Sequence, residues 1–327
     1  MISRSYKPEF TLIFISTGLF LLLMALIGGC TERYPELNLK PPEDIDTVAA
    51  PTPQYHPQAP FSFGPEAPFV RFAIAPVVAP VQAREEYRGL LTYFPEQFGR
   101  PIEMVLRPTH AEINQLLRQN LVDIALVGSY SYLELEASGD VELLAVPKRN
   151  GRVHHNAHII VPEESKIKTL EDLRGRRFVF TDSLSFPGKL YTVRKLEELG
   201  ETPASFFSDY IFSYSHENSI IAVAEEWVDA ASVCSLVYEH LVKENPELED
   251  RIRIIESSPP VGNPPLVINS SAEEEFKREL EEFFLSMHED SQGREALEEM
   301  RIEEFVPGVA VDYNRLRQMF INPVGGD

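Results

Sequence analysis

The fold class is decided by a stretch in the middle of the chain, Phe178-Val179-Phe180-Thr181-Asp182-Ser183-Leu184-Ser185-Phe186-Pro187-Gly188. Its first four residues predict a buried strand, and the apolar spacing from Lys189 to Leu199 predicts a helix. The polar residues between them form a turn at the carboxyl end of the strand. Backbone N–H groups and the positive end of a helix dipole meet at such a turn, and both attract an anion.

The same alternation of strands and helices continues on both sides of this stretch. Apolar runs and period-two alternation predict further strands at residues 70–74, 102–106, 122–127, 141–146, 158–161, 211–214 and 230–233. Helical spacing lies next to most of them, which is typical of sheets that have helices on both faces. We therefore expect an α/β fold with mostly parallel sheets and no internal repeat.

Two helices have ends that the sequence marks. Pro95 interrupts the helical spacing before Gly99, so we expect this helix to kink or to end early, with the glycine at its C-terminus. A capping box from Thr109 to Glu112 predicts the start of the next helix, which should run to about Asn120.

The N-terminus has the features of an export signal. Arg4 and Lys7 precede an almost entirely apolar run at residues 10–27, which ends in Ile27-Gly28-Gly29-Cys30. This tetrapeptide resembles a bacterial lipobox, so we expect residues 1–29 to be a lipoprotein signal peptide and Cys30 to be lipidated. The alternative is an uncleaved single-span anchor, since about 17 to 25 apolar residues suffice to cross a bilayer. Both alternatives place the rest of the chain in the periplasm or at the cell surface of a bacterium.

Residues 30–68 predict a tether between the lipid and a folded body. Nine prolines lie between Pro35 and Pro68, with no sustained period. In polyproline conformation, at about 3.1 Å per residue, such a segment reaches on the order of 100 Å. The chain that follows is long enough for two domains.

Composition excludes some classes of partner. Removal of residues 1–29 leaves 28 basic and 50 acidic side chains, a net charge of −22, which repels nucleic acid and anionic lipid headgroups. A small anion remains a suitable ligand, because exposed charges are screened within about 8 Å at physiological salt. Once Cys30 is lipidated, Cys234 has no disulfide partner. None of the glycine-rich, nucleophile-elbow or zinc-protease motifs of enzymes is present, so we expect no enzymatic activity and no cofactor.

Three histidines lie close together but do not predict a metal site. On a strand, His154 and His158 point to one face and His155 to the other, so their ring nitrogens do not converge on one ion.

Polar residues lie at four junctions where a strand leads into a helix: Thr109-His110, Gly128-Ser129-Tyr130-Ser131, Asp182 to Gly188, and Ser215-His216-Glu217-Asn218. Ser185 either donates its hydroxyl to an anionic oxygen or only caps the helix that follows. His216 either donates a hydrogen bond into a cleft or is a satisfied core histidine. Asp229 either accepts a hydrogen bond from a protonated ligand oxygen or is a solvated turn residue. Three tyrosines are candidates for the cleft wall, with packing as the alternative: Tyr130, Tyr132 and Tyr191.

Several ordered motifs resemble those of a known family. These are the serine turn at Asp182 to Gly188, Ser215-His216-Glu217 followed by Ala222-Val223 and Val228-Asp229, Val122 to Ala125 before Gly128, Leu170 to Gly175, and Ile254 to Pro259. From about residue 69 to 320 the chain resembles the phosphate/phosphite/phosphonate-binding proteins of ABC importers, a branch of the type II periplasmic binding proteins. The resemblance implies two lobes that close on a small oxyanion.

The resemblance also implies roles for individual residues. Ser185, the amides near Gly188, His216 and Asp229 would hold the ligand. Phe186 and Pro187 stand where the family has threonine and a second serine, and His110 stands where phosphonate binders have tyrosine.

The expected arrangement has one lobe at 69–156 plus 257–327 and the other at 157–256, with crossings near Ala157 to Val161 and Ile254 to Ser258. The expected function is ligand delivery to an ABC permease by a lipid-anchored monomer. One alternative is a sensory protein that docks on a membrane kinase or cyclase, and another is a hydrolase or transferase.

Overall fold

The computed structural model describes residues 69–76 and 80–321. The predicted leader, Cys30 and the proline-rich tether therefore lie outside the described residues. Within the described ranges, every helix is too short or too polar to cross a bilayer.

The first lobe is built on a six-stranded sheet with the order β13-β4-β12-β3-β1-β2. Its strands are β1 (Val70–Ile74), β2 (Ile102–Leu106), β3 (Ile124–Leu126), β4 (Val141–Lys148), β12 (Leu266–Asn269) and β13 (Glu304–Pro307). The predicted alternation in β1 is confirmed: Phe72 and Ile74 join the apolar core on one face of the sheet, and Ala73 joins the core on the other.

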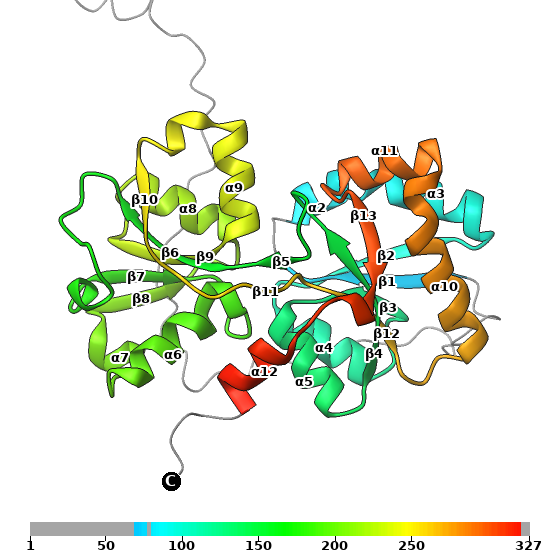
Figure 1. Ribbon diagram of the computed structural model, residues 1–327, viewed down its shortest axis with the longest axis horizontal. Coiled ribbons are helices and arrows are strands. Elements are labelled where there is room, and N and C mark those ends of the chain that lie inside the picture. The colour runs from blue at the N-terminus through cyan, green and yellow to red at the C-terminus, as the bar shows by residue number, and fades with distance from the viewer. Residues whose placement is uncertain (1–68, 77–79, 322–327) are drawn as a thin grey trace, which may run out of the picture. The chain divides into compact units, whose positions relative to one another are not determined.

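Helices cover both faces of this sheet (Figure 1). One face packs against α3 (Arg88–Phe98), which follows α2 (Pro80–Glu86), and against α10 (Glu274–Ser286) and α11 (Ser291–Glu299). The opposite face packs against α4 (His110–Arg118), α5 (Ser129–Ala137) and α12 (Asn314–Ile321). The central strands β1, β3 and β12 are therefore buried along their whole length, whereas the edge strand β2 has an exposed Glu103.

The second lobe is built on a five-stranded sheet with the order β10-β6-β9-β7-β8. Its strands are β6 (Ala157–Pro162), β7 (Arg177–Phe180), β8 (Asp209–Phe212), β9 (Ala230–Cys234) and β10 (Ile252–Ser257). The apolar core on one face includes side chains of α6 (Tyr191–Glu198) and α7 (Pro203–Phe206). The core on the other face includes side chains of α8 (His216–Ala224) and α9 (Ser235–Glu244).

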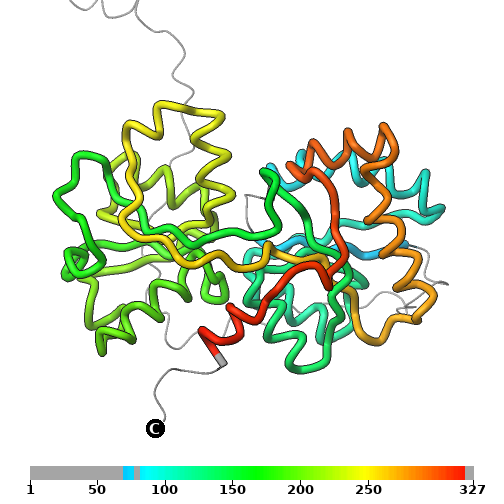
Figure 2. Tube along the Cα trace, viewed as in Figure 1, coloured from blue at the N-terminus to red at the C-terminus, as the bar shows by residue number. Residues whose placement is uncertain are grey.

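The chain passes between the two sheets after β4 and returns after β10 (Figure 2). Two short strands, β5 (His154–His155) and β11 (Val261–Gly262), lie on these connecting segments and pair in antiparallel fashion. The crossings were expected within β6 and β10, but those strands belong to the second sheet. The connecting residues are therefore 149–156 and 258–265, just outside the expected positions.

The sheets are mixed, and the expectation of mostly parallel sheets is wrong in this detail. β1 is parallel to β2 and β3, and β7 is parallel to β8 and β9, whereas all other pairs are antiparallel. The cause lies in the connections. β6 and β12 each begin where the chain enters a sheet from a connecting segment, and they run away from that segment. Their neighbours run in the opposite direction, toward the cavity described below: β9 beside β6, and β3 beside β12.

Two local predictions have opposite outcomes. The Thr109 cap is confirmed, since its side chain accepts a hydrogen bond from the Glu112 amide at 3.2 Å. The early helix end at Pro95 is wrong, because α3 continues to Phe98. Gly99 then adopts the left-handed conformation, with φ of 76°, as expected for a glycine that follows a helix.

Candidate functional site

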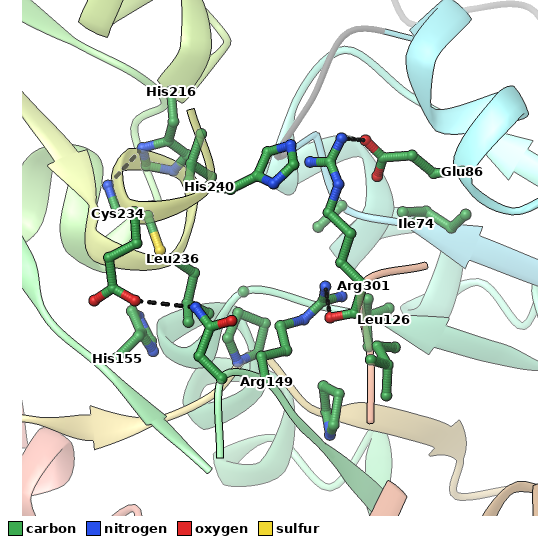
Figure 3. Close-up of a pocket in the computed structure, with 18 of the residues that line it drawn as sticks. Ile74, Glu86, Leu126, Arg149, His155, His216, Cys234, Leu236, His240 and Arg301 are labelled. Atoms are coloured by element: carbon green, nitrogen blue, oxygen red, sulfur yellow. Dashed lines mark hydrogen bonds and ion pairs between the residues drawn. The ribbon is translucent and has the colours of Figure 1, made fainter. Parts of the chain in front are cut away.

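A cavity of about 810 Å³ is lined by residues of both lobes. It lies where β1, β3 and β9 end, because Ile74, Leu126 and Cys234 are the last residues of those strands and all three line it. Figure 3 shows Ile74 and Leu126 on one side of the space and His216 and Cys234 on the other. The cavity thus occupies the carboxyl edge at which α/β folds bind ligands.

His216 lines this cavity from the first turn of α8. Its Nδ1 accepts a hydrogen bond from the backbone amide of Cys234 at 3.0 Å. Burial lowers the pKa of His216 to about 3, and the neighbouring rings of His110 and His155 act in the same direction. The ring is therefore neutral with its proton on Nε2, and in this tautomer it has one N–H to donate.

Ser185 lines the cavity and also caps the helical turn that follows it. Its Oγ accepts a hydrogen bond from the Gly188 amide at 3.1 Å, which leaves the hydroxyl proton available to another acceptor. The amides of Lys189 and Leu190 donate to the Ser185 carbonyl, each at 3.0 Å. The amides near Gly188 therefore bond within the turn, and the expectation that they bind the ligand is corrected.

Gly188 itself does not line the cavity, but its missing side chain shapes the turn. A Cβ at this position would lie 1.5 Å from Thr181 Oγ1 and 2.9 Å from Ser185 Oγ. Only glycine allows the turn to pack so closely against the end of β7.

His110 connects the two lobes through its backbone. Its amide donates to Asp182 Oδ2 at 3.2 Å, and Asp182 Oδ1 accepts from the Leu184 amide at 2.8 Å. The imidazole lines the cavity and packs on Gly128, where a Cβ would lie 3.1 Å from the ring. Burial lowers the pKa of His110, and the Asp182 carboxylate acts in the opposite direction.

His155 is a third buried histidine of the cavity, and the sequence did not suggest this role. Burial lowers its pKa to about 3, while a hydrogen bond with the Gly262 backbone acts in the opposite direction. The ring is therefore neutral, with one donor and one acceptor nitrogen. Its Nδ1 is buried and has no hydrogen-bond partner within the protein.

Two arginines also line the cavity. Arg149 follows β4, and its Nη1 donates to the carbonyls of Met300 at 2.7 Å and Arg301 at 2.9 Å. Arg301 follows α11 and pairs with Glu86 at 3.0 Å. Neither arginine belongs to a motif in the sequence. The available signal was the position of Arg149 just after a predicted strand.

Comparison with known proteins identifies the family. A family model described as "ABC transporter, phosphonate, periplasmic substrate-binding protein" matches residues 72–313. The chain belongs to this family. It is therefore an extracytoplasmic substrate-binding protein of the ABC transporter type, as the motifs predicted.

Relatives of this phosphonate-binding family agree in sequence and fold. The phosphonates-binding periplasmic protein of Escherichia coli (strain K12) is 25% identical over 237 residues, which cover 71% of this chain and 70% of that protein. The binding protein component of an ABC phosphonate transporter from Pseudomonas aeruginosa is 25% identical in a solved structure, with a TM-score of 0.69. That match covers 77% of this chain and 85% of the other.

A further solved structure supports the fold alone. PhnD1 from Prochlorococcus marinus, solved in complex with methylphosphonate, is 16% identical, with a TM-score of 0.68 over 77% of this chain and 97% of that one. The expected class, a type II periplasmic-binding-protein fold, is confirmed by these likenesses.

Phe186 lines the cavity where the family resemblance implies a hydroxyl donor. Its side chain is buried and belongs to the apolar cluster of the first lobe. The ring lies 6.1 Å from those of His155 and Tyr191 and 6.2 Å from that of Phe320, measured between centroids. Apolar packing between the lobes therefore stands where the resemblance implied a hydroxyl donor.

Asp229 lies away from the cavity, although the resemblance implied a role in ligand binding. Its Oδ2 accepts hydrogen bonds from the amide of Arg177 at 2.8 Å and from the guanidinium of the same residue at 3.3 Å. Arg177 begins β7, so Asp229 lies at the amino ends of the parallel strands, opposite to the cavity. We therefore leave it out of the proposed site.

The second junction contributes Gly128 and Ser129 to the cavity. Ser129 lines it, but its hydroxyl donates to the Gly262 carbonyl at 2.8 Å. Tyr130 packs edge-on against Phe320, and Ser131 is buried outside the cavity. The helical rotation of α5 explains this, because only its first residue faces the cavity.

The remaining expected site residue is Tyr191, which also lies outside the cavity. Its hydroxyl donates to Glu256 Oε1 at 2.8 Å. Its ring belongs to the same apolar cluster as Phe186.

The three-histidine cluster of the sequence is split in the structure. His155 is buried at the cavity, whereas His158 Nδ1 lies 2.9 Å from Ser257 Oγ. Among the described residues, no group of three or more His, Cys, Asp or Glu side chains is arranged to hold a metal ion.

Proposed function

We propose that this protein is a lipid-anchored binding protein that delivers a small phosphorus oxyanion, namely phosphate, phosphite or a phosphonate, to an ABC permease. The observation that supports it best is the pairing of two neutral donors at one cavity. The Ser185 hydroxyl and the Nε2–H of His216 are both buried, and each has its other polar position already bonded within the protein. Such donors can replace water around an anionic oxygen.

Binding would favour a closed arrangement of the two lobes. The His110–Asp182 hydrogen bond and the packing of Phe186 join residues of both lobes beside the cavity. A ligand that bonds to both lobes stabilises this arrangement over an open one by hinge motion, and the permease recognises the closed form.

The proposal includes an anchor on Cys30. Diacylation of this residue would hold the protein at a bacterial membrane, with the proline-rich segment as a spacer. A Cys30→Ser variant should move from the membrane fraction to the soluble fraction. If it still sediments with membranes, the apolar run at residues 10–27 is an uncleaved anchor instead.

Ligand identity is tested by thermal denaturation of the full-length protein in detergent with phosphate, phosphite, methylphosphonate, aminoethylphosphonate, sulfate and arsenate. A ligand at 100 times its Kd adds about 2.7 kcal/mol to the free energy of unfolding, which gives a clear rise in Tm. We expect that rise with at least one phosphorus oxyanion. If none raises Tm at millimolar concentration, the proposed ligand class is wrong.

A further inference from the structure

The cavity is larger than a simple oxyanion requires. Pockets of about 300 to 1,000 Å³ hold drug-sized molecules, whereas phosphate has only five heavy atoms. Besides Ser185 and His216, the lining includes side chains from the segment after β4, from α9 and from the end of α11. Figure 3 shows the side chains of Arg149 and Arg301 in the space between the residues of the two lobes.

Arg149 has no carboxylate partner among the described residues. Its guanidinium donates to the carbonyls of Met300 and Arg301, which fix it in place without supplying a negative charge. An arginine side chain has five N–H groups, and the two carbonyls accept one hydrogen bond each. Three N–H groups of Arg149 therefore remain for other acceptors. Arg301, in contrast, is paired with Glu86.

Tyr87 adds a second donor beside this guanidinium. Its side chain is buried and lines the cavity, and Arg149 lies close enough to lower the pKa of its hydroxyl. A neutral phenol has one O–H that it can donate to a ligand oxygen. Burial raises the pKa of Tyr87 to about 12, against the effect of Arg149, so the hydroxyl keeps its proton.

The carboxylates of the lining do not offer a comparable site for a cation. With the exception of Glu298, which is exposed, each has a bonded or ion-paired partner within the protein: Glu86, Glu239, Glu244, Glu299 and Glu303. Lys243 and Arg294, the other lining cations, are exposed. Arg149 is therefore the partly buried cation of the lining without a carboxylate in direct contact, and the nearby Glu86 carboxylate is already paired with Arg301.

We propose that Arg149, with Tyr87, forms a second anion subsite in the same cavity. The preferred ligand would then be a phosphonate or phosphate ester that has a second anionic group, a carboxylate or a second phosphoryl group, on a short chain. This inference rests on the proposed function, since Ser185 and His216 would hold the first anionic group.

The test compares ligands that differ only in the second group. Calorimetric titration of the full-length protein uses 3-phosphonopropionate, its uncharged amide, and 3-aminopropylphosphonate. We expect the carboxylate to bind at least tenfold more tightly than the amide, which corresponds to about 1.4 kcal/mol. The amine should bind no better than the amide. Equal affinities, or a preference for the amine, would overturn the subsite.

Variants assign the preference to one residue. Arg149→Gln should bring the ratio of carboxylate to amide affinity close to one, and Arg149→Lys, which keeps the charge, should restore part of it. Arg176→Gln removes the same charge at an exposed position away from the cavity and should keep the wild-type ratio. A wild-type ratio in Arg149→Gln would refute the assignment.

The outcomes separate the two proposals. If methylphosphonate and the amide bind but the carboxylate binds no more tightly, only the second subsite is wrong. If none of these phosphonates binds to the wild type, the ligand class and the subsite are both wrong. The wild-type comparison decides even if a variant fails to fold.

Discussion

Replacement of Ser185 by alanine separates its two roles, because the chain contains a matched control. Ser185 and Ser215 are both 3% exposed, and each caps a helical turn by accepting a hydrogen bond from the amide three residues later. The acceptor distances are 3.1 Å and 3.3 Å. Only Ser185 lines the cavity.

Each of the two roles has an expected energetic effect. Loss of an N-cap hydroxyl reduces the free energy of unfolding by about 0.5 to 2 kcal/mol, so both variants should be destabilised to a similar extent. Loss of a hydrogen bond to a charged ligand costs about 1.5 to 3 kcal/mol more in binding. Ser185→Ala should therefore bind the oxyanion roughly 10 to 150 times more weakly, whereas Ser215→Ala should keep wild-type affinity.

The assay measures stability and affinity on the same preparations. Urea denaturation without ligand gives the loss of the cap, and calorimetric titration with the best ligand of the panel gives the loss of the donor. If both variants bind the ligand with wild-type affinity, Ser185 is only a helix cap. A loss of affinity in Ser215→Ala as large as in Ser185→Ala would show that the helix cap, and not contact with the ligand, controls binding.

Two further predictions concern the same region. Because burial lowers the pKa values of His155 and His216 to about 3, the unfolded chain binds more protons than the folded one between pH 3 and 6.5. The two histidines therefore cost no stability above pH 6.5. Below it, each lowers the free energy of unfolding by up to about 1.4 kcal/mol per pH unit. The buried carboxyl groups of Glu86 and Glu217, whose pKa values are raised, act in the opposite direction and reduce this loss. Denaturant midpoints at pH 7.5 and 5.0 should show the loss, and an unchanged midpoint would contradict it. Gly188→Ala places a Cβ 1.5 Å from Thr181 Oγ1, so it should destabilise by about 1 to 3 kcal/mol or more and weaken ligand binding, as measured by melting and titration. A variant with wild-type Tm and affinity would contradict the geometry of the turn.

Much of the fold follows from short-range patterns in the sequence. Period-two alternation located β1, and the Thr109 cap located the start of α4. The direction of strands after a crossing depends on where the chain enters the sheet, which no local pattern encodes. The helix that contains Pro95 continues because proline removes only one intrahelical donor, and tertiary packing of Tyr93 and Phe94 in the core holds the remaining turns.

The site was predictable where a strand leads into a helix and less so elsewhere. Ser185 and His216 lie at such junctions, and the structure places both at the cavity. Asp229 precedes its strand, and a residue before a parallel strand lies at the amino edge, away from the cavity. Arg149 and His155 lie on or beside a segment between the lobes, where sequence periodicity gives no direction.

The hydrogen-bond pattern of the cavity also predicts which tetrahedral anion is rejected. The Nδ1 of His155 is buried without a hydrogen-bond partner, and the low pKa keeps the ring neutral. A neutral imidazole has one acceptor nitrogen, and with Nδ1 in that role it favours a ligand oxygen that has a proton. Phosphate or a phosphonate at pH 6 keeps one such proton, since the second pKa of a phosphoryl group is near 6 or above. Sulfate has none, and its oxygen would face the lone pair of His155. Leaving a buried polar group unpaired costs about 1 to 3 kcal/mol, so sulfate should bind roughly 5 to 150 times more weakly than phosphate in parallel titrations at pH 6. Equal affinity for the two anions would mean that His155 does not face the ligand.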